Sequence, residues 1–211
     1  PNLFQMMENA GRNLALTVID VHGDRWNQVP IVSVAGTGGN GGGGICAARH
    51  LANRGADVTV VVTDGARLGD VPRVQLELFR ATPGRVGEIG DLGELQPGLI
   101  LDAVIGYSLR GAPRGASLEL IDWANAQDAP TVSLDVPSGL DSTTGEAEGA
   151  VVRAAATMTL ALPKTGLDAE TVGGLWLADI GIPGEVYRRV GVDLPADMFG
   201  PAFRVPLTPY P

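Results

Sequence analysis

The sequence predicts an α/β protein, a three-layer α/β/α Rossmann-like fold with a mostly parallel central sheet. Several expected strands are continuous apolar runs, such as Val58 to Val62, and such runs are typical of parallel strands covered on both faces. Expected strands also alternate with expected helices, the order that produces right-handed crossovers. A glycine-rich segment follows the first strand and precedes a helix. No linker interrupts this pattern, so residues 1–211 are expected to form a single domain.

The elements follow from apolar periodicity and from the turn residues between apolar runs. Apolar residues recur at helical spacing from residue 3 to residue 20, so a helix is expected there. Strands are expected at 31–35, 57–63, 99–105, 131–135, 156–162 and 175–179, and further helices at 44–54, 70–81, 114–127 and 184–190. The proline-rich tail, 193–211, is expected to lie on the surface without regular structure.

Charge and cysteine content exclude several classes of partner. The formal net charge is −9, which argues against binding to nucleic acid or to an anionic membrane, because both require basic patches. No apolar run has the length of a membrane span. Cys46 is the single cysteine, so there is no intrachain disulfide framework, and a reducing, cytoplasmic location is expected. The Cys46 side chain is expected to pack in the core.

The segment from Gly36 to Gly44 contains seven glycines among nine residues. Glycine allows positive φ and a close approach of the backbone to a ligand, and a helix that starts beside such a loop favours anions. The match to G-x-G-x-x-G is weak evidence for dinucleotide binding, and the absence of a following Gly-Lys-Ser/Thr argues against a P-loop. Asn40 is the only residue of the segment with a sizeable polar side chain, so it must carry any side-chain chemistry there.

Two aspartates, Asp102 and Asp135, interrupt or end expected apolar strands. A buried carboxylate is costly unless it is paired or binds a cation, and the alternative is a loop-capping aspartate that accepts hydrogen bonds from nearby amides. Asn40 and Ser138 follow neighbouring strands, so oxygen atoms are expected to converge at one sheet edge. Such oxygen ligands suit an alkali or alkaline-earth cation.

The sequence does not contain the residue patterns of a zinc site or of a serine hydrolase. The sequence has two histidines and one cysteine, far apart, which argues against a zinc site. Ser138 lies in Pro-Ser-Gly and not in a nucleophile elbow, so a Ser-His-Asp hydrolase is not expected.

These motifs together resemble the YjeF N-terminal domain family, whose enzymes are NAD(P)H-hydrate epimerases. The resemblance covers nearly the whole chain, and the motifs occur in the family's order. They are Met7 to Gly11 (MENAG), Gly36 to Leu51, Leu101 to Gly106 (LDAVIG), Leu134 to Asp141 (LDVPSGLD) and Pro163 to Leu167 (PKTGL).

The resemblance implies an isomerase of metabolite repair that interconverts the R and S forms of hydrated NADH or NADPH, with a potassium ion as cofactor. It implies Asn40, Asp102 and Ser138 as potassium ligands. Placement after neighbouring strands favours Asp135 as the catalytic acid–base group and Lys164 as a supporting charge. The substrate is expected to contact Gly39, Asn40, Gly41, Gly42, Gly43, Gly106, Tyr107, Ser108, Leu109, Arg110, Gly111, Ala112 and Asp135.

The glycine segment departs from the family's usual GPGNNGGDG. Gly39 stands where the family has a further asparagine, and Gly43 stands where it has an aspartate. Two interpretations therefore remain: an epimerase that uses backbone amides and Asn40, or a non-catalytic nucleotide-binding or scaffold member of the family. The resemblance also implies a homodimer formed around the first helix. Met6 and Met7 are expected to pack either in the core or at this subunit contact. The complementary dehydratase is expected to be a separate protein.

Overall fold

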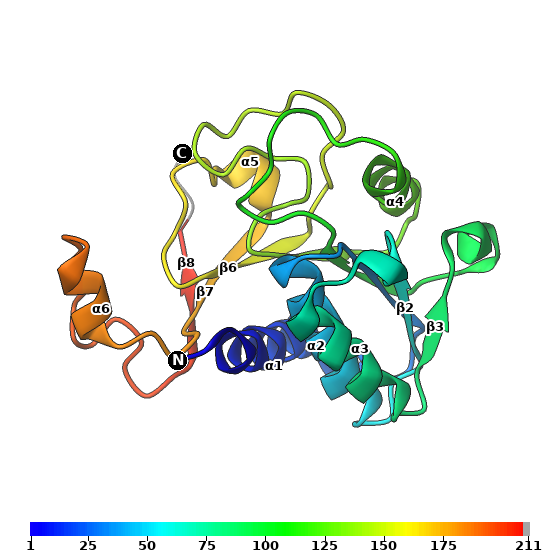
Figure 1. Ribbon diagram of the computed structural model, residues 1–211, viewed down its shortest axis with the longest axis horizontal. Helices are drawn as coiled ribbons and strands as arrows, with labels where there is room; N and C mark the ends of the chain where they lie inside the picture. The colour runs from blue at the N-terminus through cyan, green and yellow to red at the C-terminus, as the bar shows by residue number, and fades with distance from the viewer. Residues whose placement is uncertain (209–211) are drawn as a thin grey trace.

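The computed structural model describes residues 1–208 and contains one mixed sheet within that range (Figure 1). The strand order is β3-β2-β1-β4-β5-β6-β7-β8, and all neighbours are parallel except β7 and β8. The strands are β1 (Ile31–Ala35), β2 (Val58–Val62), β3 (Arg85–Gly87), β4 (Leu99–Ala103), β5 (Thr131–Leu134), β6 (Ala156–Leu160), β7 (Gly174–Ala178) and β8 (Arg204–Leu207).

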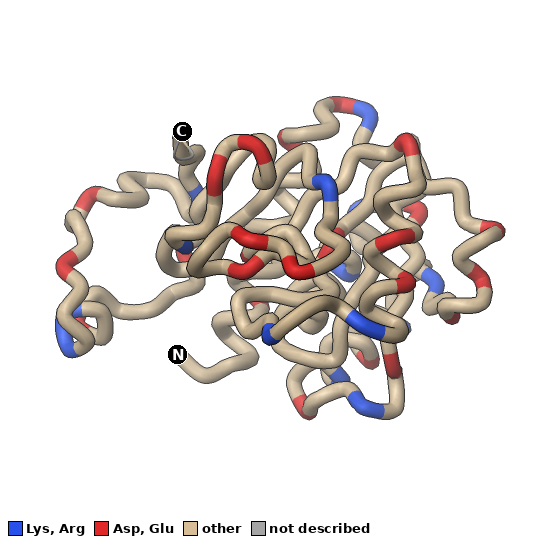
Figure 2. The backbone as a smooth tube through the Cα atoms, turned by 90° about the horizontal axis from the view of Figure 1, so that it is seen from above, with Lys and Arg blue, Asp and Glu red and all other residues tan. Residues whose placement is uncertain are grey.

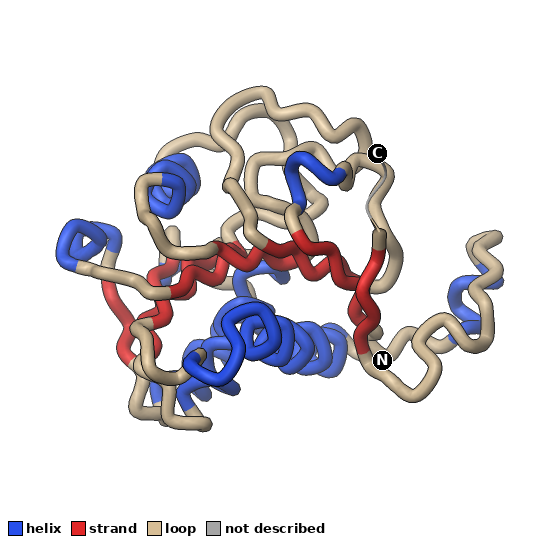
Figure 3. The backbone as a smooth tube through the Cα atoms, turned by 180° about the vertical axis from the view of Figure 1, so that it is seen from behind, coloured by secondary structure: helices blue, strands red, loops and turns tan. Residues whose placement is uncertain are grey.

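Helices cover both faces of the sheet, as the expected three-layer fold requires (Figures 1 and 3). One face carries α1, α2 and α3, while α4, the short α5 and long loops lie over the other, and α6 projects from the sheet's β8 edge. The helices are α1 (Leu3–His22), α2 (Gly39–Ala52), α3 (Asp70–Arg80), α4 (Ala116–Asn125), α5 (Ala169–Val172) and α6 (Gly184–Arg189), with 3₁₀ turns η1 (Gly23–Arg25), η2 (Gly65–Arg67) and η3 (Ile89–Glu94).

The core forms because the central strands bury side chains on both faces. Every residue of β1, β4 and β5 is buried, as expected for parallel strands between two layers. The largest apolar cluster lies between the sheet and α1–α2. The first helix begins at a capping box, in which the Asn2 side chain accepts from the Gln5 amide at 2.8 Å and Gln5 accepts from the Asn2 amide at 2.9 Å.

The glycine segment differs from the expectation. Helix α2 begins at Gly39, five residues before the expected start, and no glycine from Gly36 to Gly44 has a positive φ. The glycines serve close packing instead. A Cβ at Gly41 would lie 1.9 Å from the Gly36 carbonyl oxygen, and one at Gly44 would lie 2.4 Å from the Ala103 Cβ. The first turns of α2 therefore pack directly against the sheet, which local propensity alone would not predict.

Other boundaries differ by a few residues. The strands expected to end at 105, 135 and 162 end at Ala103, Leu134 and Leu160, so the polar residues after them lie in loops. The tail expected to lack regular structure contributes β8, which pairs with β7, while residues 209–211 of that tail lie outside the described residues. The strand β3 and the helix α5 are also additional to the expected elements.

The charged residues are dispersed over the molecule. Figure 2 shows Asp and Glu around much of the outline, with Lys and Arg interspersed among them. No helix within residues 1–208 combines the length and the apolarity that a membrane span needs.

Candidate active site

A cavity of about 680 Å³ opens where the carboxyl ends of β5 and β6 face α1 and the start of α2. This is the sheet edge at which ligands bind in open α/β folds. Its lining is mostly apolar, and Asp135 and Lys164 are the charged residues in it. The lining comprises Leu3, Met6, Met7, Ala10, Gly39, Asn40, Gly43, Gly106, Tyr107, Ser108, Leu134, Asp135, Leu160, Ala161, Leu162, Pro163, Lys164 and Ile180.

Asp135 lines the cavity, and its carboxylate is held by several contacts. Asp135 directly follows β5, and its amide donates to the Met158 carbonyl of the neighbouring strand at 2.8 Å. The carboxylate is buried and forms an ion pair with Lys164 through Oδ1. Oδ1 also accepts from the Leu160 amide at 3.3 Å, and Oδ2 accepts from the Tyr107 amide at 3.2 Å. Oδ1 is therefore the more heavily engaged oxygen, and Oδ2 is the freer one.

The ammonium group of Lys164 is fixed by three partners. Besides Asp135, it donates to the Thr159 hydroxyl at 3.1 Å and to the Leu160 carbonyl at 2.8 Å. Three donors and three acceptors match the capacity of a lysine ammonium. Lys164 is thus a positioned charge beside Asp135 and not a mobile surface lysine.

Backbone strain is also concentrated at the cavity. Asp135 has φ of 71° and Ala161 has φ of 63°, and these are the two non-glycine residues with positive φ in the described chain. Both line the cavity. Such conformations cost roughly 1–3 kcal/mol each and persist where the surrounding structure imposes them, which is common at active sites. These two residues are the centres of tight turns directly after β5 and β6, in which the Val136 amide donates to the Leu134 carbonyl and the Leu162 amide donates to the Leu160 carbonyl.

The second buried aspartate, Asp102, has different surroundings. It lies on β4 opposite Ser133 of β5, and it is fully buried. Its carboxylate accepts from the Ser133 hydroxyl at 2.8 Å, from the Ser138 amide at 2.8 Å and from the Ser138 hydroxyl at 2.5 Å. Within residues 1–208 no basic side chain forms an ion pair with it. Burial raises the pKa of Asp102, and these hydrogen bonds oppose that rise.

Asn40 lies beside Gly106, the residue that follows Ile105. A Cβ built on Gly106 would lie 3.0 Å from Asn40 Oδ1, and the adjacent residue Ile105 donates its amide to the Ser138 hydroxyl at 2.8 Å. The two-residue segment 105–106 is thus near both Asn40 and Ser138. The Asn40 Nδ2 atom is buried and has no hydrogen-bond partner among the described residues. The Asn40 amide is therefore not fully satisfied by the protein.

The residues expected to contact substrate divide into two groups. Asp135, Gly39, Asn40, Gly43, Gly106, Tyr107 and Ser108 line the cavity. The others lie outside its lining: Gly41 faces Gly36, Gly42 packs against Met7, and no residue from Leu109 to Ala112 is part of the lining. Asp102 and Ser138 are not part of the lining, but the Ser138 hydroxyl accepts from the Ile105 amide, next to the lining residue Gly106.

Sequence reasoning missed the wall that α1 contributes. Met6 and Met7 are expected to pack in the core or at a subunit contact, and in the structure both also line the cavity, together with Leu3 and Ala10. These residues share one face of α1 at helical spacing, so the signal was present but identical to that of core packing. Ala161 carried no signal at all, because its strained conformation is imposed by tertiary structure.

The two departures from the family's glycine segment have different structural settings. A Cβ at Gly39 would meet no heavy atom within 4 Å, so this position faces open space. A Cβ at Gly43 would lie 2.6 Å from Cδ2 of Leu134, a fully buried side chain. Leu134 therefore occupies space that a side chain at position 43 would need.

Comparisons with known proteins agree with this architecture. A crystal structure of the yeast protein ynu0 (YNL200c) superposes with a TM-score of 0.83 over 98% of this chain and 91% of that one, at 21% identity, which supports the fold. An NAD(P)H-hydrate epimerase of Dehalogenimonas lykanthroporepellens is 50% identical over 91% of this chain and 78% of its own length. The corresponding Truepera radiovictrix epimerase is 39% identical over 89% and 84%.

Another relative is much longer than this chain. The bifunctional NAD(P)H-hydrate repair enzyme Nnr of Salinibacter ruber is 38% identical over 88% of this chain, but the match covers 38% of that enzyme. Residues 3–166 match the family model described as YjeF-related protein N-terminus. The expectation drawn from the sequence motifs is confirmed: the chain belongs to the YjeF-related N-terminal domain family.

Proposed function

We propose that the chain is an NAD(P)H-hydrate epimerase that interconverts the R and S forms of hydrated NADH or NADPH. The similarity to curated epimerases over most of their length supports this activity. The structural observation that supports the chemistry is the Asp135–Lys164 ion pair, which lines a mostly apolar cavity.

Epimerisation requires a hydroxyl group to leave one face of the nicotinamide ring and return to the other. We assign proton transfer in both steps to Asp135. In its acid form it protonates the departing hydroxyl, the carbon–oxygen bond breaks, and water leaves. Water then adds to the opposite face and returns the proton. Positioned acid–base groups contribute about 10² to 10⁴ in rate.

The roles of the two carboxylate oxygens follow from their contacts. Oδ1 is held by Lys164 and by the Leu160 amide, whereas Oδ2 accepts one hydrogen bond, from the Tyr107 amide. Oδ2 is thus the oxygen available to substrate. Lys164 fixes the carboxylate's orientation, and the apolar wall formed by Met6, Met7 and Leu134 limits the access of bulk water.

A potassium ion is part of the proposal. The fit rests on the chemistry of the donor set: Asp102 is a fully buried carboxylate surrounded by neutral donors, and the side chains of Asn40 and Ser138 offer an amide oxygen and a hydroxyl oxygen. Amide, carboxylate and hydroxyl oxygens are the ligands that hard cations prefer. Asn40, Asp102 and Ser138 would hold the ion, which would supply a fixed positive charge beside the cavity.

We further propose a pathway context, an oligomeric state and a cellular location for the protein. The substrate is taken up as a free small molecule, and the complementary dehydratase acts as a separate protein. We also propose a homodimer and a cytoplasmic location, the latter in keeping with a buried free thiol at Cys46.

The altered glycine segment favours one alternative, a binding protein without turnover. Gly43 presents no carboxylate to the cavity, so any contribution of that group to catalysis is absent.

The test is the rate at which purified R-hydrate of NADPH becomes available to a dehydratase specific for the S form. An epimerase increases this rate in proportion to protein concentration, and Asp135→Asn abolishes most of the increase. A rate equal to spontaneous epimerisation, combined with saturable binding of the hydrate, would support the binding protein instead.

A further inference from the structure

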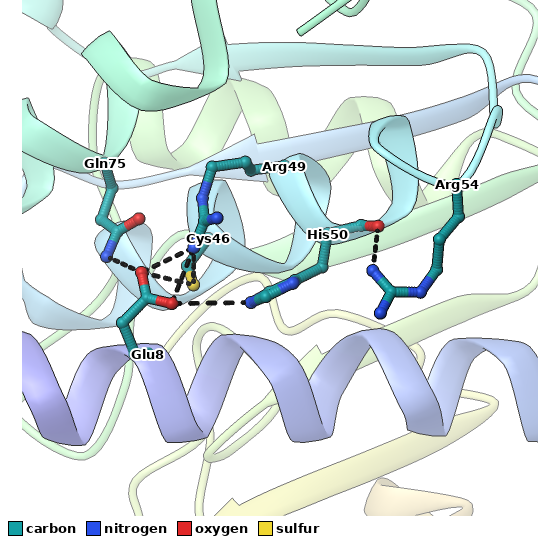
Figure 4. A network of polar contacts seen from close by, with 6 residues as sticks. All are labelled: Glu8, Cys46, Arg49, His50, Arg54 and Gln75. Carbon is teal, nitrogen blue, oxygen red and sulfur yellow. Dashed lines mark hydrogen bonds and ion pairs between the residues drawn. The ribbon is translucent and has the colours of Figure 1, made fainter. Parts of the chain in front are cut away.

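A polar network outside the cavity joins the three helices on one face of the sheet (Figure 4). Its centre is Glu8 of α1, whose carboxylate accepts from Arg49 of α2 at 2.6 and 2.7 Å and from Gln75 of α3 at 2.8 Å. The Cys46 thiol and His50 Nε2 each lie 3.6 Å from a Glu8 oxygen. One side chain thus holds contacts to both neighbouring helices.

Three residues of this network have the chemistry of metal ligands, but the geometry favours a structural network. The ligand atoms of Glu8, Cys46 and His50 lie within 4.8 Å of one another. The Arg49 guanidinium contacts two of them: Nη2 donates to the Glu8 carboxylate and lies 3.4 Å from the Cys46 sulfur. Burial raises the pKa of Cys46 to about 12, so the thiol remains protonated and is a poor ligand. Arg49 therefore supplies the positive charge that a metal would supply.

Glu8 is ionised in this setting. Burial raises the pKa of Glu8, but the hydrogen bond from Gln75 and the charge of Arg49 outweigh that effect and leave it below its ordinary value. The Glu8 side chain is 30% exposed and the Arg49 side chain 15% exposed. The pair is therefore partly shielded from solvent, where its attraction is stronger than that of a surface pair.

The network and the cavity share the same two helices. On α2, Gly39 and Gly43 line the cavity, and Cys46 and His50 reach Glu8, all at spacings of three or four residues along one helical face. On α1, Met7 lines the cavity directly beside Glu8 in the sequence. Any change in the spacing between α1 and α2 at Glu8 therefore changes the width of the cavity.

Glycine contacts make this interface sensitive to small displacements. A Cβ at Gly42 would lie 2.4 Å from the Met7 sulfur, and a Cβ at Gly11 would lie 2.5 Å from Cys46. The two helices are thus in close contact on both sides of Glu8. Apolar contacts do not by themselves fix the relative position of two helices, because they are not directional. The hydrogen bonds of the Glu8 network are directional and can fix it.

We propose, on the basis of the proposed epimerase function, that Glu8 is a positioning residue: it joins α1 to α2 and α3 and so fixes the apolar wall of the cavity against Asn40. Glu8 is not among the described residues that line the cavity, so it acts through Met6 and Met7. The wall binds substrate and carries no reacting group. Loss of the network should therefore weaken substrate binding more than it slows the chemical step.

The test compares Glu8→Gln with Asp20→Asn. Asp20 lies on the same helix and forms an ion pair with Arg204, but it belongs to the last turn of α1, away from the cavity. Glu8→Gln should raise KM for the NADPH hydrate roughly 3- to 30-fold, less than the ~100-fold loss that a 1 Å misplacement can produce, with kcat within about threefold. Asp20→Asn should leave both constants within about twofold.

A second readout does not depend on activity. Amide hydrogen exchange should become faster over the first turns of α1 in Glu8→Gln, and only over its last turns in Asp20→Asn. Arg49→Lys, which removes the guanidinium that makes the two shortest contacts from α2 to Glu8, should change KM in the same direction. It replaces Glu8→Gln if that variant does not fold.

Two outcomes would overturn the positioning role: an unchanged KM in the folded variants, or a loss of activity that merely follows the loss of folded protein. An inactive wild-type protein would instead refute the epimerase proposal. In that case the exchange data still decide the positioning role, since unchanged exchange over the first turns of α1 overturns it.

Discussion

Two buried aspartates follow the same pattern in the sequence and have opposite surroundings in the structure. Asp135 lines the cavity, forms an ion pair with Lys164 and has a strained backbone with φ of 71°. Asp102 is not part of the cavity lining, and its hydrogen bonds come from neutral donors, chiefly Ser133 and Ser138. The position of a carboxylate at a strand end therefore does not identify its role. The role is identified by the charge of the groups that it contacts and by whether it lines the cavity.

The largest effect on stability is expected at the Asp135–Lys164 pair. Lys164→Met leaves the Asp135 carboxylate buried without its counter-charge, and breaking such pairs costs roughly 3–5 kcal/mol when burial is complete. Because the Lys164 side chain is 19% exposed, we expect a smaller loss, about 2–4 kcal/mol, in the free energy of unfolding. Urea unfolding measures it.

A double-mutant cycle sharpens this prediction. Adding Asp135→Asn to Lys164→Met removes the unpaired charge and should restore part of the lost stability. The control is Arg85→Met, which breaks the exposed pair with Asp57 and should change the free energy by about 0.5 kcal/mol or less. Equal losses in Lys164→Met and Arg85→Met would mean that the Asp135 carboxylate is not confined as described.

A smaller effect is expected at Asp102, on the response to potassium. An ion that binds only the folded state stabilises it, by about 2.7 kcal/mol when its concentration is 100 times Kd. The Tm of the wild-type protein should therefore rise in potassium chloride relative to choline chloride at equal ionic strength. Asp102→Asn should abolish this difference, because the variant lacks the one carboxylate of the proposed ligand set.

The matched control for this experiment is Asp141→Asn. Asp141 lies three residues after Ser138 in the chain. Its carboxylate accepts hydrogen bonds from the Thr143 and Thr144 amides and makes no hydrogen bond to the Asp102 group. It should retain the potassium response. A full response in Asp102→Asn, or none in the wild-type protein, would contradict the proposed cation site.

Much of the fold followed from the sequence because its signals are local. The apolar runs at 31–35 and 58–62 and the helical period of 3–20 each determine an element almost independently of the rest. The short strand β8 has no such signal, since it has four residues, one of them Pro206, and its place in the sheet depends on pairing with β7. The early start of α2 was missed because glycine is a poor helix former, and close packing against the sheet overrides that propensity.

The site was predictable in its polar part and not in its apolar part. Asp135 is identified because a carboxylate ends an apolar strand, Asn40 because it is the one sizeable polar side chain among the glycines, and Lys164 from its place after a strand and from the family resemblance. The structure brings all three to one cavity. Met6 and Met7 were not identified, because apolar residues on a helix face have the same pattern whether they fill a core or line a cavity. The Glu8 network depends on contacts among three helices that no local pattern contains.

The most direct test of the central claim is kcat for epimerisation of the NADPH hydrate in Asp135→Asn and Asp102→Asn, measured side by side at saturating potassium. If Asp135 moves the proton and Asp102 only supports the site, Asp135→Asn should lower kcat by about 10² to 10⁴ while remaining folded, and Asp102→Asn should lower it by about tenfold or less. A folded Asp135→Asn variant with wild-type kcat, beside an inactive Asp102→Asn, would contradict the account.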